Sequence, residues 1–102
     1  ATITIEDDVL LGSGVHIYVS NHKYDDISIP IMEQGWCNFK NVILRRGCWI
    51  GANAIILPGV EVGQNSVIAA GSVVTKSVPP GTLYGGNPAR FIRRIAKIKK
   101  NK

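Results

Sequence analysis

Aliphatic residues recur at every sixth position over two long stretches of this chain. The first run has three members and the second has six: Ile5, Leu11 and Ile17, then Leu44, Ile50, Ile56, Val62, Ile68 and Val74. Leu, Ile and Val make up 29 of the 102 residues, so this arrangement in a fixed phase would arise by chance only about once in 10⁵. The period matches neither an α-helix nor a simple alternating strand.

A parallel β-helix with a triangular cross-section does have this period. Each side is a short strand and a corner, three sides make a coil of about 18 residues, and the aliphatic side chain points inward. The residue after the aliphatic is often small, as at Gly12, Gly51, Gly63 and Ala69, which suits a tight corner. The pattern therefore predicts an all-β solenoid.

The two runs are out of phase with each other. The spacing from Ile17 to Leu44 is not a multiple of six, so extra residues must leave the helix between them. We expect residues 5–22 to form one coil, residues 44–79 to form two, and the segment at about 23–41 to be a loop excursion. A long loop on a rigid scaffold often carries function.

The pattern changes again after residue 79. The segment PPG at 79–81 predicts the end of the β-helix, and GGNPAR predicts a turn. Phe91, Ile92, Ile95 and Ile98 then follow at roughly helical spacing. We expect a β-helical domain over 1–79 and a C-terminal segment over 80–102 that contains the turn, a short basic helix and a tail.

Positive charge is concentrated at the end of the chain. The net charge is +5, yet residues 90–102 hold seven of the twelve Lys and Arg and no acid, so the rest carries five basic and seven acidic side chains, a net of −2. This distribution favours a local anionic contact or a solvated end, and it argues against a surface that coats nucleic acid.

Length and composition restrict the class of protein. A chain of 102 residues forms one small domain. No apolar run approaches the ~20 residues that span a bilayer, and no signal-peptide pattern opens the sequence. Cys37 and Cys48 lack the spacing of a zinc or redox motif, which predicts free thiols and a cytoplasmic protein.

Two segments of the chain match a family motif. The longer one reads VILRRGCWIGANAIILPGVEVGQNSVIAAGSVVTKSVPPGTLYGGNPARFIRRI, and the upstream one reads TITIEDDVLLGSGVHIYVSNH. Together they resemble the hexapeptide-repeat acyltransferases, in particular the galactoside, maltose and surface-polysaccharide O-acetyltransferases. The resemblance implies a left-handed parallel β-helix, a homotrimer with sites at subunit interfaces, and acetyl transfer from acetyl-coenzyme A (acetyl-CoA) to a hydroxyl of a sugar or saccharide, without a metal.

The resemblance also implies a catalytic base. In this family a histidine at the end of a coil, just before a protruding loop, is the general base, and His22 occupies that place. A neutral imidazole can take the proton of the acceptor hydroxyl as its oxygen attacks the thioester. His16 lies one repeat earlier without these features, and we expect it to be structural.

Cofactor-binding positions carry over in the same way. They are Trp49, Ala52, Ala70, Thr75, Lys76, Arg90 and Arg93. Ala52 and Ala70 match positions that line the coenzyme A groove, and a backbone N–H near Ala52 could stabilise an oxyanion. These alanines are also separated by three whole repeats, which stacks them on adjacent coils. That periodicity leaves open whether they line a groove or only fit a side of the helix.

The other cofactor positions match family residues that lie near different parts of coenzyme A. Trp49 matches an aromatic that packs near the pantetheine, and it needs a packing partner or a subunit contact in either case. Thr75 and Lys76 resemble residues at the nucleotide end. Arg90 and Arg93 resemble the phosphate contacts, for which guanidinium groups are suited.

The acceptor site is the part of the expected active site that the sequence determines least. Its candidates lie on or beside the excursion: Asn21, Tyr24, Asp26, Met32 and Trp36. Relatives carry an N-terminal helical segment and further coils before the equivalent of Ala1, and part of the acceptor site lies there. The sequence is therefore expected to be a truncated form or to have a reduced acceptor pocket.

Other functions are compatible with the same helix. A zinc enzyme would need three protein ligands, normally histidines, and the chain has only His16 and His22. A non-catalytic assembly module, or an inactive truncated acetyltransferase, stays open as the alternative. A trimer is also a physical expectation, because three coils make a small core with open ends and flat sides.

Overall fold

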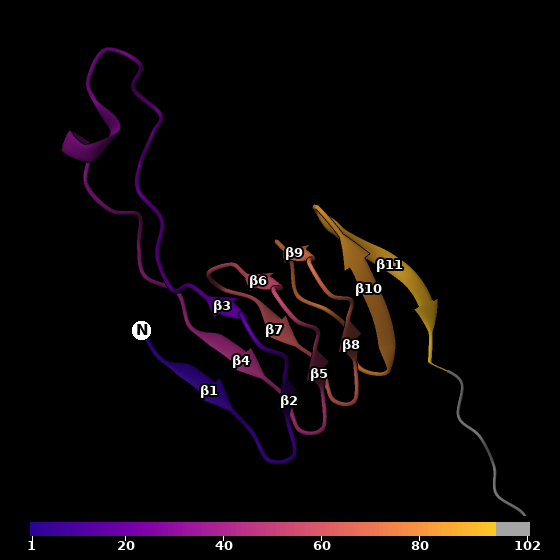
Figure 1. Ribbon diagram of the computed structural model, residues 1–102. Helices are drawn as coiled ribbons and strands as arrows, with labels where there is room; N and C mark the ends of the chain where they lie inside the picture. Colours follow the sequence, from indigo (N-terminus) through magenta and orange to yellow (C-terminus); the bar gives the residue numbers. More distant parts are fainter. Residues whose placement is uncertain (96–102) are drawn as a thin grey trace, which may run out of the picture.

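Residues 1–95 of the chain are described by the computed structural model, and they form the predicted left-handed parallel β-helix with a protruding loop (Figure 1). Three sheets form its walls. The first wall contains β1 (Ile3–Ile5), β4 (Val42–Leu44) and β7 (Glu61–Val62). The second contains β2 (Leu10–Leu11), β5 (Trp49–Ile50), β8 (Val67–Ile68), β10 (Thr82–Gly86) and β11 (Ala89–Arg94). The third contains β3 (His16–Ile17), β6 (Ile55–Ile56) and β9 (Val73–Val74).

Successive coils pair in a fixed register. Ile43 pairs with Glu61, so the second and third coils are separated by three repeats of six. Ile3 pairs with Val42, so the step from the first coil to the second is more than twice as long. The difference between the two steps is the length of chain that leaves the helix as the excursion.

The aliphatic residues of the six-residue repeat fill the interior of the helix. Those of the second and third coils are fully buried: Leu44, Ile50, Ile56, Val62, Ile68 and Val74. Ile5 and Leu11 are 48% and 45% exposed, because their coil forms one end of the described helix. Cys48 also points inward, and burial raises the pKa of its thiol to about 11. Both cysteines are free thiols, as predicted.

Adjacent coils approach each other closely at three corners where glycine follows an inward aliphatic, namely Gly12, Gly51 and Gly63. A Cβ added to Gly51 would lie 2.6 Å from the amide nitrogen of Ala70 and 2.7 Å from the carbonyl oxygen of Ile68. Gly12 and Gly63 face the backbone of the next coil in the same way. Close packing leaves no room for a larger side chain there. This contact explains the small residues that follow the aliphatics in the sequence.

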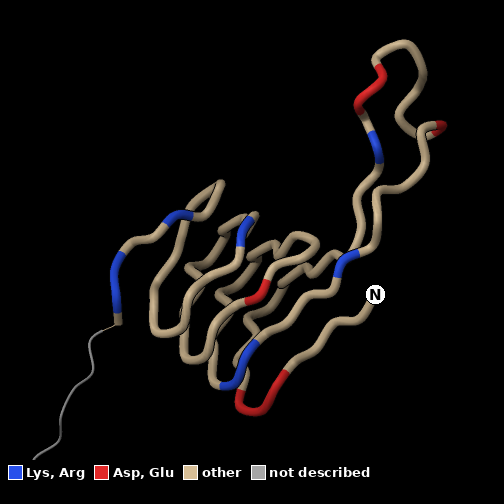
Figure 2. Tube along the Cα trace, turned by 180° about the vertical axis from the view of Figure 1, so that it is seen from behind, with Lys and Arg blue, Asp and Glu red and all other residues tan. Residues whose placement is uncertain are grey.

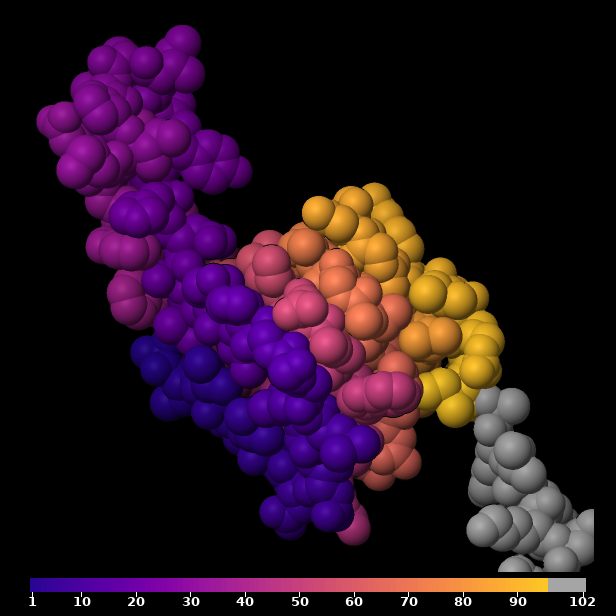
Figure 3. All heavy atoms as spheres, viewed as in Figure 1, coloured from indigo at the N-terminus to yellow at the C-terminus, as the bar shows by residue number. Residues whose placement is uncertain are grey.

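The excursion leaves the helix after Val19 and returns at Lys40, whose N–H donates to the Val19 carbonyl at 2.8 Å. It projects away from the stacked coils (Figure 1), and in the space-filling view it stands off the body as a separate lobe (Figure 3). Its one short helical turn is η1 (Ile31–Glu33). Ile27 at its outer part is fully exposed.

The solenoid continues past the PPG segment, which was expected to end it. Strand β10 pairs in parallel with β8, with Leu83 opposite Val67 and Tyr84 opposite Ile68. The buried hydroxyl of Ser66 accepts a hydrogen bond from Thr82 N–H at 3.2 Å, which ties the start of β10 to the third coil. Residue 79 is therefore no structural boundary on this wall.

The expected C-terminal helix is wrong over residues 89–94. These residues form β11, which pairs antiparallel with β10 across the turn at residues 87–88. Phe91 and Ile92 are as compatible with a strand as with a helix, and β10 offers a free edge for pairing. Phe91 also packs edge-on against Tyr84, with ring centroids 5.9 Å apart. Ile98 and the basic tail, at 96–102, lie outside the described residues.

The charges of the described residues are unevenly placed. Basic residues mark the last strand, β11, and acidic residues mark the excursion and the corner that follows β1 (Figure 2). At the first wall, Arg45 bridges two carboxylates on neighbouring coils: Nη1 lies 2.9 Å from Glu6 and Nε lies 2.7 Å from Glu61. This ladder ties the three coils together on their outer side.

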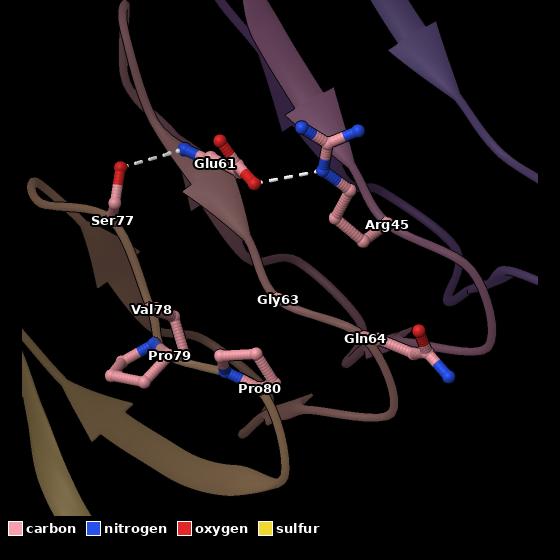
Figure 4. A pocket seen from close by; sticks show the side chains of 8 residues that line it. All are labelled: Arg45, Glu61, Gly63, Gln64, Ser77, Val78, Pro79 and Pro80. Atoms are coloured by element: carbon pink, nitrogen blue, oxygen red, sulfur yellow. Dashed lines mark hydrogen bonds and ion pairs between the residues drawn. The ribbon is translucent and has the colours of Figure 1, made fainter.

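A hollow of about 480 Å³ lies beside the ladder, between β7 and the last turn of the solenoid. Arg45 and Glu61 lie next to each other on one side of it, and Pro79 and Pro80 lie on the opposite side (Figure 4). The polar groups here already bind one another. Glu61 N–H donates to the Ser77 hydroxyl at 2.9 Å, and its carboxylate accepts from Arg45.

The corner contact gives a stability prediction. Gly51→Ala should lower the free energy of unfolding by about 1–3 kcal/mol, because the added methyl group meets backbone atoms that cannot move aside. Urea unfolding followed by circular dichroism, at one fixed protein concentration, measures it. Ser13→Ala, at an exposed place on the same corner of the first coil, is the control and should change little. Equal stability of Gly51→Ala and the wild type would contradict the packing.

The charge ladder gives a pH prediction. The Arg45 side chain, and then the Arg46 backbone N–H, hold the pKa of Glu6 below its ordinary value of 4.5. As the pH falls, the Glu6 carboxylate of the unfolded chain is protonated before that of the folded chain. The ladder therefore stabilises the fold above pH 4.5, and that contribution is lost as the pH falls through the lowered pKa. Glu6→Gln should be less stable than the wild type near neutral pH and equal to it in acid.

Chemical unfolding at a series of pH values tests this difference. Asp7→Asn is the matched control, since the Asp7 carboxylate forms no ion pair within residues 1–95. A gap between Glu6→Gln and the wild type that does not close on acidification would contradict the role of the ladder.

Candidate active site

His22 lies where the excursion leaves the helix, beside a hollow of about 430 Å³. The residues lining this hollow are Tyr18, Ser20, Asn21, His22, Trp36 and Leu57. Tyr18 directly follows β3, and Leu57 directly follows β6, so one side of the hollow belongs to the rigid coils. The other side comes from the excursion. Such a junction of scaffold and loop is a common place for a binding site.

The base of the excursion is a short antiparallel pair of segments. His22 and Trp36 form an isolated bridge, and the N–H of Cys37 donates to the carbonyl of Asn21 at 2.8 Å. This pairing places the two rings face to face, with centroids 3.9 Å apart and planes inclined by 27°. The proposed base is therefore held by a defined piece of backbone, although it lies on a loop.

The structure separates the acceptor candidates into two groups. Asn21 and Trp36 line the hollow with His22. Tyr24, Asp26 and Met32 do not line it, and they lie on the segment of the excursion between His22 and Trp36. Tyr24 and Met32 are 68% and 83% exposed. Within one chain, only the first group is beside the proposed base.

Asp26 already has partners inside the excursion. Its carboxylate accepts hydrogen bonds from the hydroxyl of Ser28 at 2.6 Å and from the N–H of Ser28 at 2.9 Å. These bonds, the hydroxyl first, lower the pKa of Asp26. The side chain of Gln34 donates to the carbonyls of Asp26 (2.8 Å) and Ile29 (3.1 Å). The excursion is thus braced internally, and no sequence pattern identified Gln34 as its brace.

A further hollow, of about 420 Å³, lies on the outer face of the second wall. It is lined by Trp49, Val67, Leu83, Arg93 and Ile95. The strand register puts the first four of these residues in one row across β5, β8, β10 and β11. Trp49 is 50% exposed. The structure therefore brings two predicted cofactor residues, Trp49 and Arg93, to one largely apolar surface.

The remaining predicted cofactor residues lie at the edges of the walls. Ala52 and Ala70 occupy the corner between the second and third walls on adjacent coils, where the N–H of Gly71 donates to the Ala52 carbonyl at 2.8 Å. Thr75 and Lys76 are exposed at the corner after β9. Arg90 lies on β11 opposite Gly85.

Sequence reasoning missed several residues that line these hollows. Tyr18, Ser20 and Leu57 belong to the hollow beside His22, and Val67 and Leu83 belong to the one beside Trp49. Tyr18 and Leu57 each follow an inward aliphatic by one position and therefore point outward. Their relation becomes visible only with the register of the first two coils, in which β3 pairs with β6 and the residue after each strand falls at the same place.

Within residues 1–95, no three side chains of His, Cys, Asp or Glu gather as a metal-ligand set would. Over the same residues, no helix has the length and apolar character that a bilayer crossing requires.

Comparison with known proteins identifies the repeat. Residues 41–76 match the family described as bacterial transferase hexapeptide (six repeats). Over 92% of its length the chain is 38% identical to galactoside O-acetyltransferase of Escherichia coli, covering 45% of that protein. Over 60% of its length it is 61% identical to 2,3,4,5-tetrahydropyridine-2,6-dicarboxylate N-acetyltransferase of Shouchella clausii, covering 25% of that protein.

Solved structures show the same fold. A galactoside acetyltransferase in complex with coenzyme A superposes with a TM-score of 0.83 at 37% identity, over 92% of this chain and 46% of that one. A hexapeptide-repeat-containing acetyltransferase of Vibrio cholerae, complexed with acetyl coenzyme A, gives a TM-score of 0.82 at 37% identity, over 93% and 50%. The chain spans about half the length of the relatives it matches. Its six-residue repeat, its β-helix and these similarities make it a member of the hexapeptide-repeat family, similar to the acetyltransferases of that family.

Proposed function

We propose that the protein transfers an acetyl group from acetyl-CoA to a hydroxyl of a sugar or saccharide, with His22 as the general base. The observation that carries this proposal is the place of His22, at the rim where the chain leaves a rigid coil and beside a hollow. The 38% identity to a galactoside O-acetyltransferase supports the same reaction. Holding both substrates in one site removes much of the entropic barrier, so no acyl-enzyme is needed.

Direct attack of the acceptor hydroxyl on acetyl-CoA proceeds in two steps. The acceptor oxygen bonds to the thioester carbonyl carbon while its proton moves to a ring nitrogen of His22. The tetrahedral intermediate then collapses, the carbon–sulfur bond breaks, and the sulfur takes the proton from the imidazolium to leave as a free thiol. The Ala52 N–H donates no hydrogen bond within residues 1–95 and is our candidate donor to the oxyanion.

We infer that acetyl-CoA lies along the outer face of the second wall. The shared hollow of Trp49 and Arg93 supports this, because it offers an apolar surface for the pantetheine and a guanidinium for a phosphate. The small side chains of Ala52 and Ala70 allow an extended arm to approach the backbone. In this proposal Thr75, Lys76 and Arg90 contribute at the nucleotide end.

The proposed site requires more than one chain. The hollow beside His22 lies next to the third wall, whereas Trp49 and Arg93 lie on the second, so one protomer presents the base and the cofactor surface on different faces. Apolar side chains are exposed on that second wall, with Leu10 65% and Trp49 50% accessible. We therefore propose a homotrimer in which each site is built from two chains.

We propose a hydroxyl acceptor rather than an amine, supported by the O-acetyltransferase match over 92% of the chain, although the relatives also include N-acetyltransferases. A parallel assay with a sugar alcohol and the corresponding amino sugar separates the two reactions. Among the acceptor candidates, Asn21 and Trp36 are the ones beside the base, while Tyr24, Asp26 and Met32 would have to act across a subunit interface.

The assignment of the base gives a catalytic prediction. His22→Ala should lower kcat by roughly 10²–10⁴-fold, because the general base is lost, while acetyl-CoA binding is kept. Release of the free thiol measures the rate, and calorimetry measures the binding. His16→Ala is the matched control, and it should keep activity. Full activity of His22→Ala would overturn the assignment, and a wild type that binds no acetyl-CoA would favour a non-catalytic assembly module.

The two-chain site gives a prediction for assembly. Light scattering coupled to size exclusion should give three times the chain mass of 11.0 kDa. A monomer that still transfers acetyl groups would contradict the proposed interface site, since one chain does not bring His22 and Arg93 to the same face.

A further inference from the structure

The contact between His22 and Trp36 is the closest aromatic pair in the described structure. Their ring centroids are 3.9 Å apart, whereas those of the other described pairs lie between 5.9 and 6.4 Å. The two residues face each other across the base of the excursion. Next to this bridge, the backbone N–H of Lys23 donates a hydrogen bond to the carbonyl of Gly35 at 2.9 Å. The stack is therefore built on paired backbone.

The imidazole of His22 has no other fixed partner. Within residues 1–95 its ring nitrogens make no hydrogen bond, and its backbone carbonyl, not its ring, faces the thiol of Cys37 at 3.7 Å. The ring of His16 differs, since its Nδ1 lies 2.9 Å from the carbonyl oxygen of Gly14. The orientation of the His22 ring thus depends on the indole beside it.

The indole of Trp36 is itself held in place. Phe39 meets it edge-on, with centroids 6.4 Å apart and planes inclined by 71°. Trp36 still lines the hollow and is 54% exposed. One face of the indole is therefore occupied by the imidazole, and the ring is braced from another direction, while the hollow stays accessible.

We propose that Trp36 is the positioning residue for the base. This inference rests on the proposed function of His22. The stacked indole holds the plane of the imidazole so that a ring nitrogen points into the hollow. When the proton of the acceptor hydroxyl moves to that nitrogen and the new carbon–oxygen bond forms, the imidazole becomes a cation, and the π face of Trp36 stabilises the positive charge. The charge disappears when the proton passes to the departing sulfur.

This role differs from that of a sugar-stacking platform. A platform binds the acceptor in its ground state, so its loss raises the KM for the acceptor and leaves kcat nearly unchanged. A positioning residue acts on a group that becomes charged only during the reaction, so its loss lowers kcat. The two roles are therefore distinguished by which constant changes: the acceptor KM for a platform, and kcat for a positioning residue.

The kinetic test compares two substitutions at one position. Trp36→Leu should lower kcat by roughly 5- to 30-fold, and Trp36→Phe by less, because phenylalanine keeps a π face of smaller area. The KM for acetyl-CoA and for the acceptor should stay within about twofold of the wild type. Ile27→Ala, at a fully exposed place on the same excursion, is the control and should not change either constant. Unchanged kcat in Trp36→Leu, or a raised acceptor KM alone, would overturn the proposal.

A spectroscopic test does not depend on activity. The ring protons of His22, assigned by comparison with His22→Ala, should be shifted upfield by the indole ring current in the wild type. The shift should shrink in Trp36→Phe and vanish in Trp36→Leu, while the signals of His16 stay in place. Unshifted His22 signals in an active wild-type enzyme would overturn the role of Trp36 alone. A wild type inactive with every acceptor would overturn the proposed function, and the positioning role with it.

Discussion

The structure depends on the parallel stacking of coils in one fixed register, in which Ile43 lies beside Glu61 and Leu44 beside Val62. This register places each inward aliphatic on the one before it, as Ile68 on Ile50. It also forces backbone against backbone at the corners, where Gly51 contacts Ala70. A shift in this spacing along a wall would turn inward residues outward. Additional residues can therefore be accommodated only where the chain passes between walls, and the excursion leaves at such a corner.

The same constraint explains why chemistry is expected at the excursion. The coils supply a regular, hydrogen-bonded surface, represented at the hollow by Tyr18 and Leu57. The excursion supplies side chains whose positions the repeat does not dictate, namely His22 and Trp36. Their short antiparallel pairing limits the freedom of the loop where it meets the scaffold. Efficient proton transfer requires a well-positioned catalytic group, and in the proposed function this junction would position His22 without a regular helix or long strand.

The parts of the fold that follow from periodicity could be predicted from the sequence. The buried row from Leu44 to Val74 and the protruding loop both follow from counting in sixes. The C-terminal segment could not be predicted in this way, because Phe91 and Ile92 suit a helix or a strand, and the free edge of β10 decided between them. Likewise, His22 could be proposed from its position in the pattern. Its partner Trp36 lies on the returning arm of the excursion, and only the pairing of the loop brings the two together.

In the proposed function, the placement of the cofactor joins the two hollows into one site. A crystal structure of the protein with coenzyme A bound tests it most directly. We predict that the phosphates lie beside Arg93, that the pantetheine passes Trp49 and Ala52, and that the thiol points toward His22 of a neighbouring chain. Coenzyme A bound instead in the hollow between Arg45 and Pro80, or with its thiol directed away from every His22, would contradict it.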